Sequence, residues 1–172
     1  MYGEDRINRF AVTVLGAFVI VHVMRILFVC HGNICRSPMA EFIMRDMVRR
    51  RGLDVHVESC ATSTEELGND VYPPARRCLE RHVIPYEHRC ARQMKTSDYN
   101  DFDMIIAMDS WNIRNMRHFV GGDPEGKVSL MMSHCGKDDD VADPWYSGDF
   151  ERTYRDITEA CEALLDSLSL KK

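Results

Sequence analysis

Apolar residues follow two different periods along the chain, and segments of the two kinds alternate. Residues 25–29 and 103–108 are almost continuously apolar, which is typical of strands buried on both faces of a parallel sheet. Residues 55–59 alternate between apolar and polar side chains, and this period of two also predicts a strand. We assign the last strand to residues 127–131, between a glycine-rich break and a polar loop.

Helical periodicity occurs between these strands and near the C-terminus. Ser37 is a suitable N-cap and Pro38 suits the first helical position, so we predict a helix that begins there and ends near Gly52. Asp109 or Ser110 is expected to cap another helix. The apolar face expected for that helix consists of Trp111, Ile113, Met116 and Phe119. The other predicted helical segments are residues 72–82, 98–102 and 149–168, the last of them capped by Asp149, and residues 132–148 are predicted to be a loop.

The alternation of strands and helices predicts an α/β fold, a doubly wound four-stranded parallel sheet with helices on both faces. The first strand would be central in a flavodoxin-like order 2-1-3-4. In such sheets, ligands bind beyond the carboxyl ends of the strands, where the strand order reverses. At 172 residues, the chain is expected to contain one domain of this kind.

Composition narrows the possible functions. A formal net charge of −5 argues against a nucleic-acid-binding protein, which normally carries a basic face. The seven cysteines are odd in number and scattered, so we interpret them as reduced thiols in a cytoplasmic protein. The sequence contains no Cys-x2-Cys pair and no histidines at ligand spacing, so neither a metal nor a cofactor is implied.

Residues 1–23 form an apolar N-terminal extension whose role the sequence leaves open. Residues 10–23 are mostly apolar, but they are fewer than the roughly 20 that a membrane-spanning helix needs. They could extend a core strand, contact a membrane surface, or result from an upstream start codon. Because Met24-Arg25 looks like a natural start, we expect residues 24–172 to form the functional domain, and we expect a monomer.

The segment from Cys30 to Arg36 carries the candidate chemistry. It joins the first predicted strand to the first helix, so its backbone N–H groups and the positive helix end should surround one point and bind an anion. A thiol facing that point should ionise readily and act as a nucleophile. Arg36 can bind two oxygens of a phosphate at once. Together these features predict phosphoryl transfer through a cysteine.

The run RILFVCHGNICRSPMAE, from Arg25 to Glu41, resembles the active-site loop of the low-molecular-weight protein tyrosine phosphatases. The resemblance implies the same strand order, Cys30 as the nucleophile and Arg36 as the phosphate clamp. The loop residues that it implies for phosphate binding are His31, Gly32, Asn33, Ile34, Cys35 and Arg36. It also implies that Ser37 donates a hydrogen bond to the cysteine sulfur, and that Asn33 and His88 belong to a network that holds the loop open.

A cysteine phosphatase also needs a general acid, because an alkoxide or phenoxide is a poor leaving group. The residues alone leave several candidates open, namely Asp138, Asp139, Asp140 and Asp143. The resemblance selects Asp143, because Asp143-Pro144-Trp145-Tyr146 is similar to the family's Asp-Pro-aromatic-aromatic motif. Trp145 and Tyr146 would then line the cleft beside a phosphotyrosine ring, or else pack within the surface loop.

Three further positions bear on substrate and regulation. Ile34 stands where the related bacterial protein-arginine phosphatases have threonine, which favours a tyrosine-phosphorylated protein as the substrate. Glu65 lies in the rim loop of the cleft, where many members have an aromatic residue, so ring stacking on that wall is expected to be weak. Cys35 is either a small packing residue or, by resemblance, a resolving thiol that makes the enzyme redox-sensitive.

Other functions on the same scaffold stay open as alternatives. One is a protein-arginine phosphatase, and another is an arsenate reductase, in which Cys78 and Cys90 would relay the oxidation. A phosphate-binding module without catalysis would be suggested by loss of Cys30, Arg36 or the late-loop acid, and all three are present. The last alternative is a membrane-associated phosphatase anchored by residues 10–23.

Overall fold

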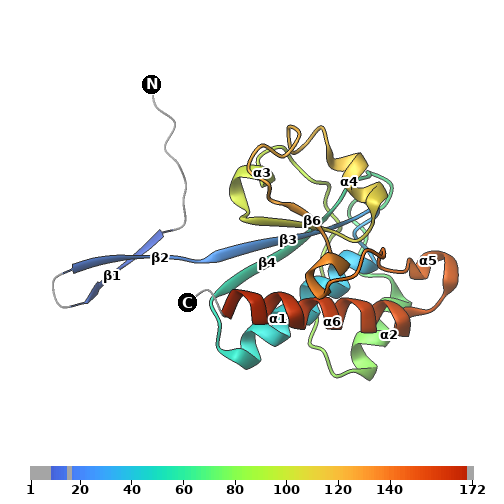
Figure 1. Ribbon diagram of the computed structural model, residues 1–172. Coiled ribbons are helices and arrows are strands. Elements are labelled where there is room, and N and C mark those ends of the chain that lie inside the picture. The colour runs from blue at the N-terminus through green and yellow to red at the C-terminus, as the bar shows by residue number, and fades with distance from the viewer. Residues whose placement is uncertain (1–8, 15–16, 170–172) are drawn as a thin grey trace.

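The structure, a computed structural model, describes residues 9–14 and 17–169 of the chain (Figure 1). Its centre is a four-stranded sheet in the order β4-β3-β5-β6, and all neighbouring strands in it are parallel. The strands are β3 (Met24–Cys30), β4 (Val55–Ala61), β5 (Met104–Ala107) and β6 (Val128–Leu130). This arrangement confirms the predicted order 2-1-3-4, with the first predicted strand inside the sheet.

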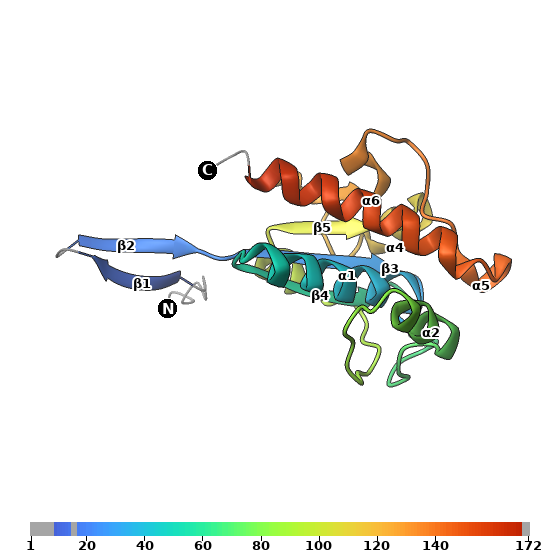
Figure 2. The same ribbon diagram turned by 90° about the horizontal axis from the view of Figure 1, so that it is seen from below.

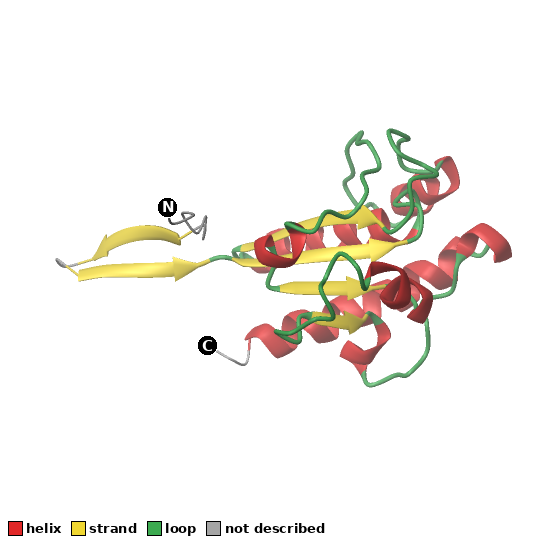
Figure 3. Cartoon of the chain, turned by 90° about the horizontal axis from the view of Figure 1, so that it is seen from above, coloured by secondary structure: helices red, strands yellow, loops and turns green. Residues whose placement is uncertain are grey.

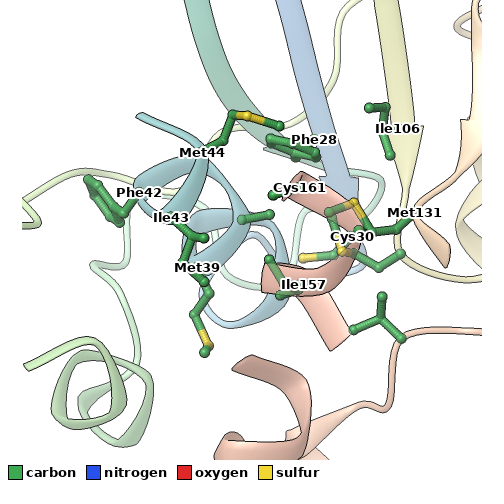
Figure 4. Close-up of a cluster of buried hydrophobic side chains, with 14 of the residues drawn as sticks. Phe28, Cys30, Met39, Phe42, Ile43, Met44, Ile106, Met131, Ile157 and Cys161 are labelled. Atoms are coloured by element: carbon green, nitrogen blue, oxygen red, sulfur yellow. The ribbon is translucent and has the colours of Figure 1, made fainter. Parts of the chain in front are cut away.

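Helices cover both faces of the sheet (Figure 1). One face carries α1 (Arg36–Arg51), α2 (Pro73–Arg81) and α6 (Phe150–Ser169), and the other carries α3 (Asp98–Asp101) and α4 (Ser110–Met116). Phe28 of the central strand packs toward α1 and α6, as Figure 4 shows, whereas Leu27 and Val29 pack toward α3 and α4. Because both faces are covered, the central strand is apolar throughout except for Arg25 near its start.

The start of α1 differs from the prediction. The helix begins at Arg36, and Cys35 at the N-cap position makes no side-chain capping bond. Ser37, predicted as the cap, lies in the first turn, and its hydroxyl contacts the sulfur of Cys30 instead. The first N–H groups of α1 therefore have no side-chain cap from Cys35, which suits a helix end that binds an anion.

Two other helix starts match their predicted caps. The Asp109 carboxylate accepts the N–H of Asn112 at 2.7 Å, and the Asp149 carboxylate accepts the N–H of Arg152 at 2.9 Å. The segment predicted as a loop before α6 contains two short helical turns. These are η1 (Met132–Cys135) and α5 (Pro144–Ser147).

The N-terminal extension contains a separate antiparallel hairpin. Strand β1 (Arg9–Val14) pairs with β2 (Ala17–His22), and neither strand joins the four-stranded sheet. Figures 2 and 3 show the hairpin projecting from the domain, beyond the start of β3. The rest of the predicted extension, residues 1–8 and 15–16, lies outside the described residues. Across the part of the chain that is described, no helix has the length and hydropathy needed to cross a membrane.

Candidate active site

Cys30 is the last residue of β3, and two polar groups approach its sulfur. The backbone N–H of Asn33 donates to Cys30 Sγ at 3.2 Å, and the hydroxyl of Ser37 lies 3.0 Å from it. Cys30 is only 3% exposed, so few water molecules can solvate the sulfur. Donors at these two positions stabilise negative charge on it in place of water.

The backbone of the loop turns its carbonyl groups outward. Thr62 N donates to Cys30 O, Ser63 N to His31 O and Tyr72 N to Ile34 O, at 2.9, 3.0 and 2.8 Å. A trans peptide unit holds its N–H opposite its C=O, so the N–H groups of His31, Gly32 and Cys35 point toward the inside of the loop. Together with the start of α1, they form a cradle for the oxygens of an anion.

Asn33 holds this loop in shape. Its φ of 58° lies in the left-handed region, which asparagine tolerates better than most residues. The buried amide donates from Nδ2 to Ser37 Oγ and Ser59 Oγ, at 2.9 and 2.8 Å. Its Oδ1 accepts from Arg89 Nη2 and from Arg92 N, at 2.9 and 3.2 Å. All four bonding positions of one amide are thus used to join the loop to α1, to β4 and to the connector after α2.

His88, which was predicted to share this network, makes no direct hydrogen bond to Asn33 in the described part of the chain. His88 is turned to solvent, where its Nδ1 lies 2.5 Å from Asp70 Oδ2. Burial opposes ionisation of Asp70, but hydrogen bonds from His88 and from two backbone N–H groups lower its pKa to about 2. Arg89 makes the direct contact with Asn33, and its Nη2 also donates to the carbonyl oxygen of Ser59, at 3.2 Å.

Arg36 is held between two carboxylates at the mouth of the loop. Its Nη1 lies 2.5 Å from Asp109 Oδ2, and its Nη2 lies 2.6 Å from Asp143 Oδ2. The Arg36 side chain is 4% exposed, whereas the Asp143 side chain is 27% exposed. Burial disfavours the charge of Arg36, but the negative charges of Cys30, Asp143 and Asp109 raise its pKa above the usual value. The guanidinium therefore stays charged and faces the same space as the sulfur.

A cleft of about 510 Å³ opens over the loop, and Cys30, Arg36 and Asp143 all line it. Its aromatic lining consists of Trp111, Trp145 and Tyr146, which are 64%, 54% and 87% exposed. Trp145 also packs on Tyr72, with ring centroids 5.2 Å apart. We predicted Trp111 on the buried face of its helix, and the structure corrects this: the indole lies at the cleft.

The remaining predicted residues lie at the rim or beneath it. Glu65 is at the rim, where its Oε2 lies 3.0 Å from His31 Nε2. Ile34 and Cys35 are buried in the loop and line the cleft. Burial, followed by the nearby Cys30, raises the pKa of Cys35, so Cys35 remains a neutral thiol.

The two cysteines considered for an arsenate reductase relay lie elsewhere. Cys78 is buried on α2, Cys90 is exposed on the connector after α2, and neither lines the cleft.

Sequence reasoning missed several functional groups of this site. Asp109 was predicted only as a helix cap, although it follows the apolar segment 103–108 and so stands at the carboxyl edge of the sheet. Its position directly after a predicted strand could therefore have identified Asp109 as a site residue. Ser59, Arg89 and Arg92 carried no comparable signal, because only the folded chain brings them to Asn33.

Comparisons with known proteins agree on one family. Residues 25–172 match the family described as low molecular weight phosphotyrosine protein phosphatase. The low molecular weight protein-tyrosine-phosphatase YfkJ of Bacillus subtilis is 37% identical over 154 residues, which cover 87% of this chain and 99% of YfkJ. The low molecular weight protein-tyrosine-phosphatase PtpA of Staphylococcus aureus is 36% identical over 81% of this chain and 90% of its own length.

Solved structures give the same result for the fold. The crystal structure of YfkJ superposes with a TM-score of 0.82, covering 87% of this chain and 96% of YfkJ. A Drosophila arginine phosphatase is 32% identical and superposes with a TM-score of 0.78, covering 84% of this chain and 98% of its own. The fold is therefore shared by one relative named as a tyrosine phosphatase and another named as an arginine phosphatase.

Proposed function

Because this chain belongs to the low molecular weight phosphotyrosine protein phosphatase family, it is a protein-tyrosine phosphatase, and we propose that Cys30, Arg36 and Asp143 carry its reaction. One observation carries this assignment: all three side chains line one cleft, and Arg36 pairs with Asp143 at 2.6 Å. The family acts through a cysteine nucleophile, and Cys30 is the cysteine whose sulfur accepts a hydrogen bond from a backbone N–H of the loop.

In the first step, the thiolate of Cys30 attacks phosphorus in line with the phenolic oxygen. The N–H groups of the loop and the guanidinium of Arg36 bind the three equatorial oxygens, where negative charge is spread in the transition state. The S–P bond forms as the P–O bond breaks, which leaves a phosphocysteine. The donors from Asn33 and Ser37 stabilise the sulfur when it later departs.

Asp143 acts as the acid of the first step and the base of the second. Its contact with Arg36 places it beside the phosphate site, and phosphate oxygens that bind Arg36 would compete for the same guanidinium. Released from Arg36, the Asp143 carboxylate takes up a proton from solvent, and as the carboxylic acid it gives this proton to the phenolic oxygen. Asp143 then takes a proton from the water that attacks the phosphocysteine, and inorganic phosphate leaves. Asp109 keeps the guanidinium oriented from the other side.

The substrates of this phosphatase are phosphorylated proteins, and the cleft supports phosphotyrosine as the phosphorylated residue. Trp111, Trp145 and Tyr146 offer aromatic surfaces for a phenyl ring entering the cleft. Ile34 adds an apolar side chain to its lining, which favours an aryl group over a charged guanidine group. Glu65 and His31 pair at the rim, so this wall of the cleft presents polar groups to the substrate.

The decisive test compares wild type with Cys30→Ser on phosphotyrosine, phosphoarginine and phosphoserine peptides, with EDTA present. We expect wild type to prefer phosphotyrosine, and the variant to lose essentially all turnover while it still binds inorganic phosphate, because the cradle remains. Full activity of Cys30→Ser would exclude the covalent mechanism. A preference for phosphoarginine would overturn the substrate assignment but leave the catalytic residues in place.

A further inference from the structure

A second group of ligand-type side chains lies between α2 and the start of α6, outside the catalytic cleft. Cys78 is in the last turn of α2, and His82 follows four residues later at its C-cap, so both lie on one side of this helix end. Glu151 belongs to the first turn of α6, which packs beside α2 (Figure 2). One ligand atom from each of the three residues lies within 4.8 Å of the other two.

The three side chains are held in place by their surroundings. The thiol of Cys78 is fully buried, and its Sγ lies 3.6 Å from Glu151 Oε1 and 3.4 Å from the carbonyl oxygen of Phe150. His82 Nε2 lies 2.7 Å from Glu151 Oε2. The imidazole stacks on the ring of Tyr154, with centroids 3.6 Å apart and planes 9° from parallel. These contacts hold three ligand-type atoms close together: a sulfur, a ring nitrogen and a carboxylate oxygen.

We propose that Cys78, His82 and Glu151 bind a thiophilic divalent cation, for which Zn²⁺ is the best match. Zn²⁺ binds sulfur, nitrogen and oxygen at about 2.0–2.3 Å, so neighbouring ligand atoms around a tetrahedral ion are about 3.3–3.7 Å apart. The distance from Cys78 Sγ to Glu151 Oε1 already lies in this range, whereas His82 contacts the other carboxylate oxygen, Oε2. The contact between His82 and Glu151 needs to open by about 0.7 Å to reach it. Water or the carbonyl oxygen of Phe150 supplies the fourth ligand.

Binding exchanges a proton for the cation and needs no oxidant. The sulfur–metal bond forms as Cys78 releases its proton to solvent, and His82 binds as the neutral imidazole. Burial and the adjacent Glu151 raise the pKa of Cys78 to about 11, so the cation itself must promote this ionisation. The side chains of His82 and Glu151 are 33% and 39% exposed, which gives the ion a path from solvent to the buried sulfur.

Arg81 competes with the cation for this site. Its Nε and Nη2 lie 2.9 and 2.5 Å from Glu151 Oε1, so its positive charge opposes a second cation nearby. The Arg81 side chain is 55% exposed and can move into water. If Cys78, His82 and Glu151 bind a metal ion, Arg81→Gln should therefore increase the affinity for that ion, although the substitution removes a salt bridge.

The test uses the full chain in a Cys30→Ser background, because the catalytic thiol could bind the same ions. Cd²⁺ and Co²⁺ are titrated while the thiolate-to-metal charge-transfer band and the visible Co²⁺ bands are recorded. Zn²⁺ is then tested for its effect on Tm, since a ligand of the native state raises it. The matched control is His56→Gln, which removes the histidine of another His–Glu pair, 2.8 Å from Glu58 Oε1.

We expect one equivalent of Cd²⁺ or Co²⁺ to produce the thiolate band, and Cys78→Ser to abolish it. His82→Gln and Glu151→Gln should each weaken binding by roughly tenfold or more, Arg81→Gln should strengthen it, and His56→Gln should leave it unchanged. A thiolate band that survives Cys78→Ser would overturn the site, as would equal binding in the Cys30→Ser protein and its His82→Gln derivative. His82→Gln and Glu151→Gln leave the buried thiol in place, so they decide the test if Cys78→Ser fails to fold.

Discussion

Replacing Asn33 separates the backbone contribution of the loop from the contribution of its hydrogen bonds. Asn33→Gly removes the amide but keeps a residue that adopts the φ of 58° freely. Asn33→Ala removes the same amide but keeps the Cβ, which disfavours this conformation in alanine. The two variants therefore lose the same hydrogen bonds and differ only in backbone preference.

The structure sets the expected magnitudes. Four hydrogen bonds are lost in either variant, to Ser37, Ser59, Arg89 and Arg92. At about 0.5–1.5 kcal/mol net for each bond, the loss is about 2–6 kcal/mol, with the lower half expected where water enters the vacated space. Left-handed strain costs alanine about 1–2 kcal/mol, and glycine loses about 0.5–1 kcal/mol through its more flexible unfolded chain. We therefore expect Asn33→Ala to be about 1 kcal/mol less stable than Asn33→Gly.

Urea unfolding in the presence of reducing agent, followed by far-ultraviolet circular dichroism, measures both free energies. Asn100→Ala is the control, because Asn100 is an exposed asparagine outside the site and should change stability by less than about 0.5 kcal/mol. The turnover of both Asn33 variants should also fall, since the amide no longer holds the loop in the shape that brings the N–H of residue 33 to the sulfur of Cys30. Equal stabilities of the glycine and alanine variants would refute the backbone argument. A loss below about 0.5 kcal/mol in Asn33→Gly would refute the hydrogen-bond argument.

Three further predictions concern the reaction. Arg36→Lys keeps the charge but cannot bind two phosphate oxygens at once, so turnover should fall several hundredfold, or roughly 3–4 kcal/mol of transition-state stabilisation. A change below tenfold in steady-state assays would contradict this. Asp143→Asn should slow hydrolysis of phosphotyrosine far more than that of an aryl phosphate with an acidic phenol, whereas Asp139→Asn should show no such dependence; the reverse pattern would show that the acid is misassigned. Mild peroxide should inactivate wild type reversibly and Cys35→Ala irreversibly, as measured by recovery with thiol, and equal recovery would remove the resolving role of Cys35.

Local features of the sequence were sufficient for the scaffold of the site. The apolar strand, the loop and the helix around Cys30 could be predicted because each depends on neighbours within a few residues. The caps at Asp109 and Asp149 were predictable for the same reason. The resemblance to a family added Asp143, which composition alone could not distinguish from the other acids in its loop.

Only the tertiary structure decided which distant side chains meet at this scaffold. Arg36 and Asp109 are 73 residues apart, and Asn33 and Arg89 are 56 apart, so their contacts depend on how strands and connectors pack. Trp111 shows a second limit: a period of apolar residues predicts a buried face, but a cleft wall is apolar too, and only packing distinguishes them. The sequence by itself determined the order of the elements, the loop and the candidate nucleophile, because these follow from local periodicity and chain direction. Long-range packing, which no local pattern encodes, produces the other contacts. These are the ion pairs of Arg36, the hydrogen bond from Arg89 to Asn33, and the cluster of Cys78, His82 and Glu151.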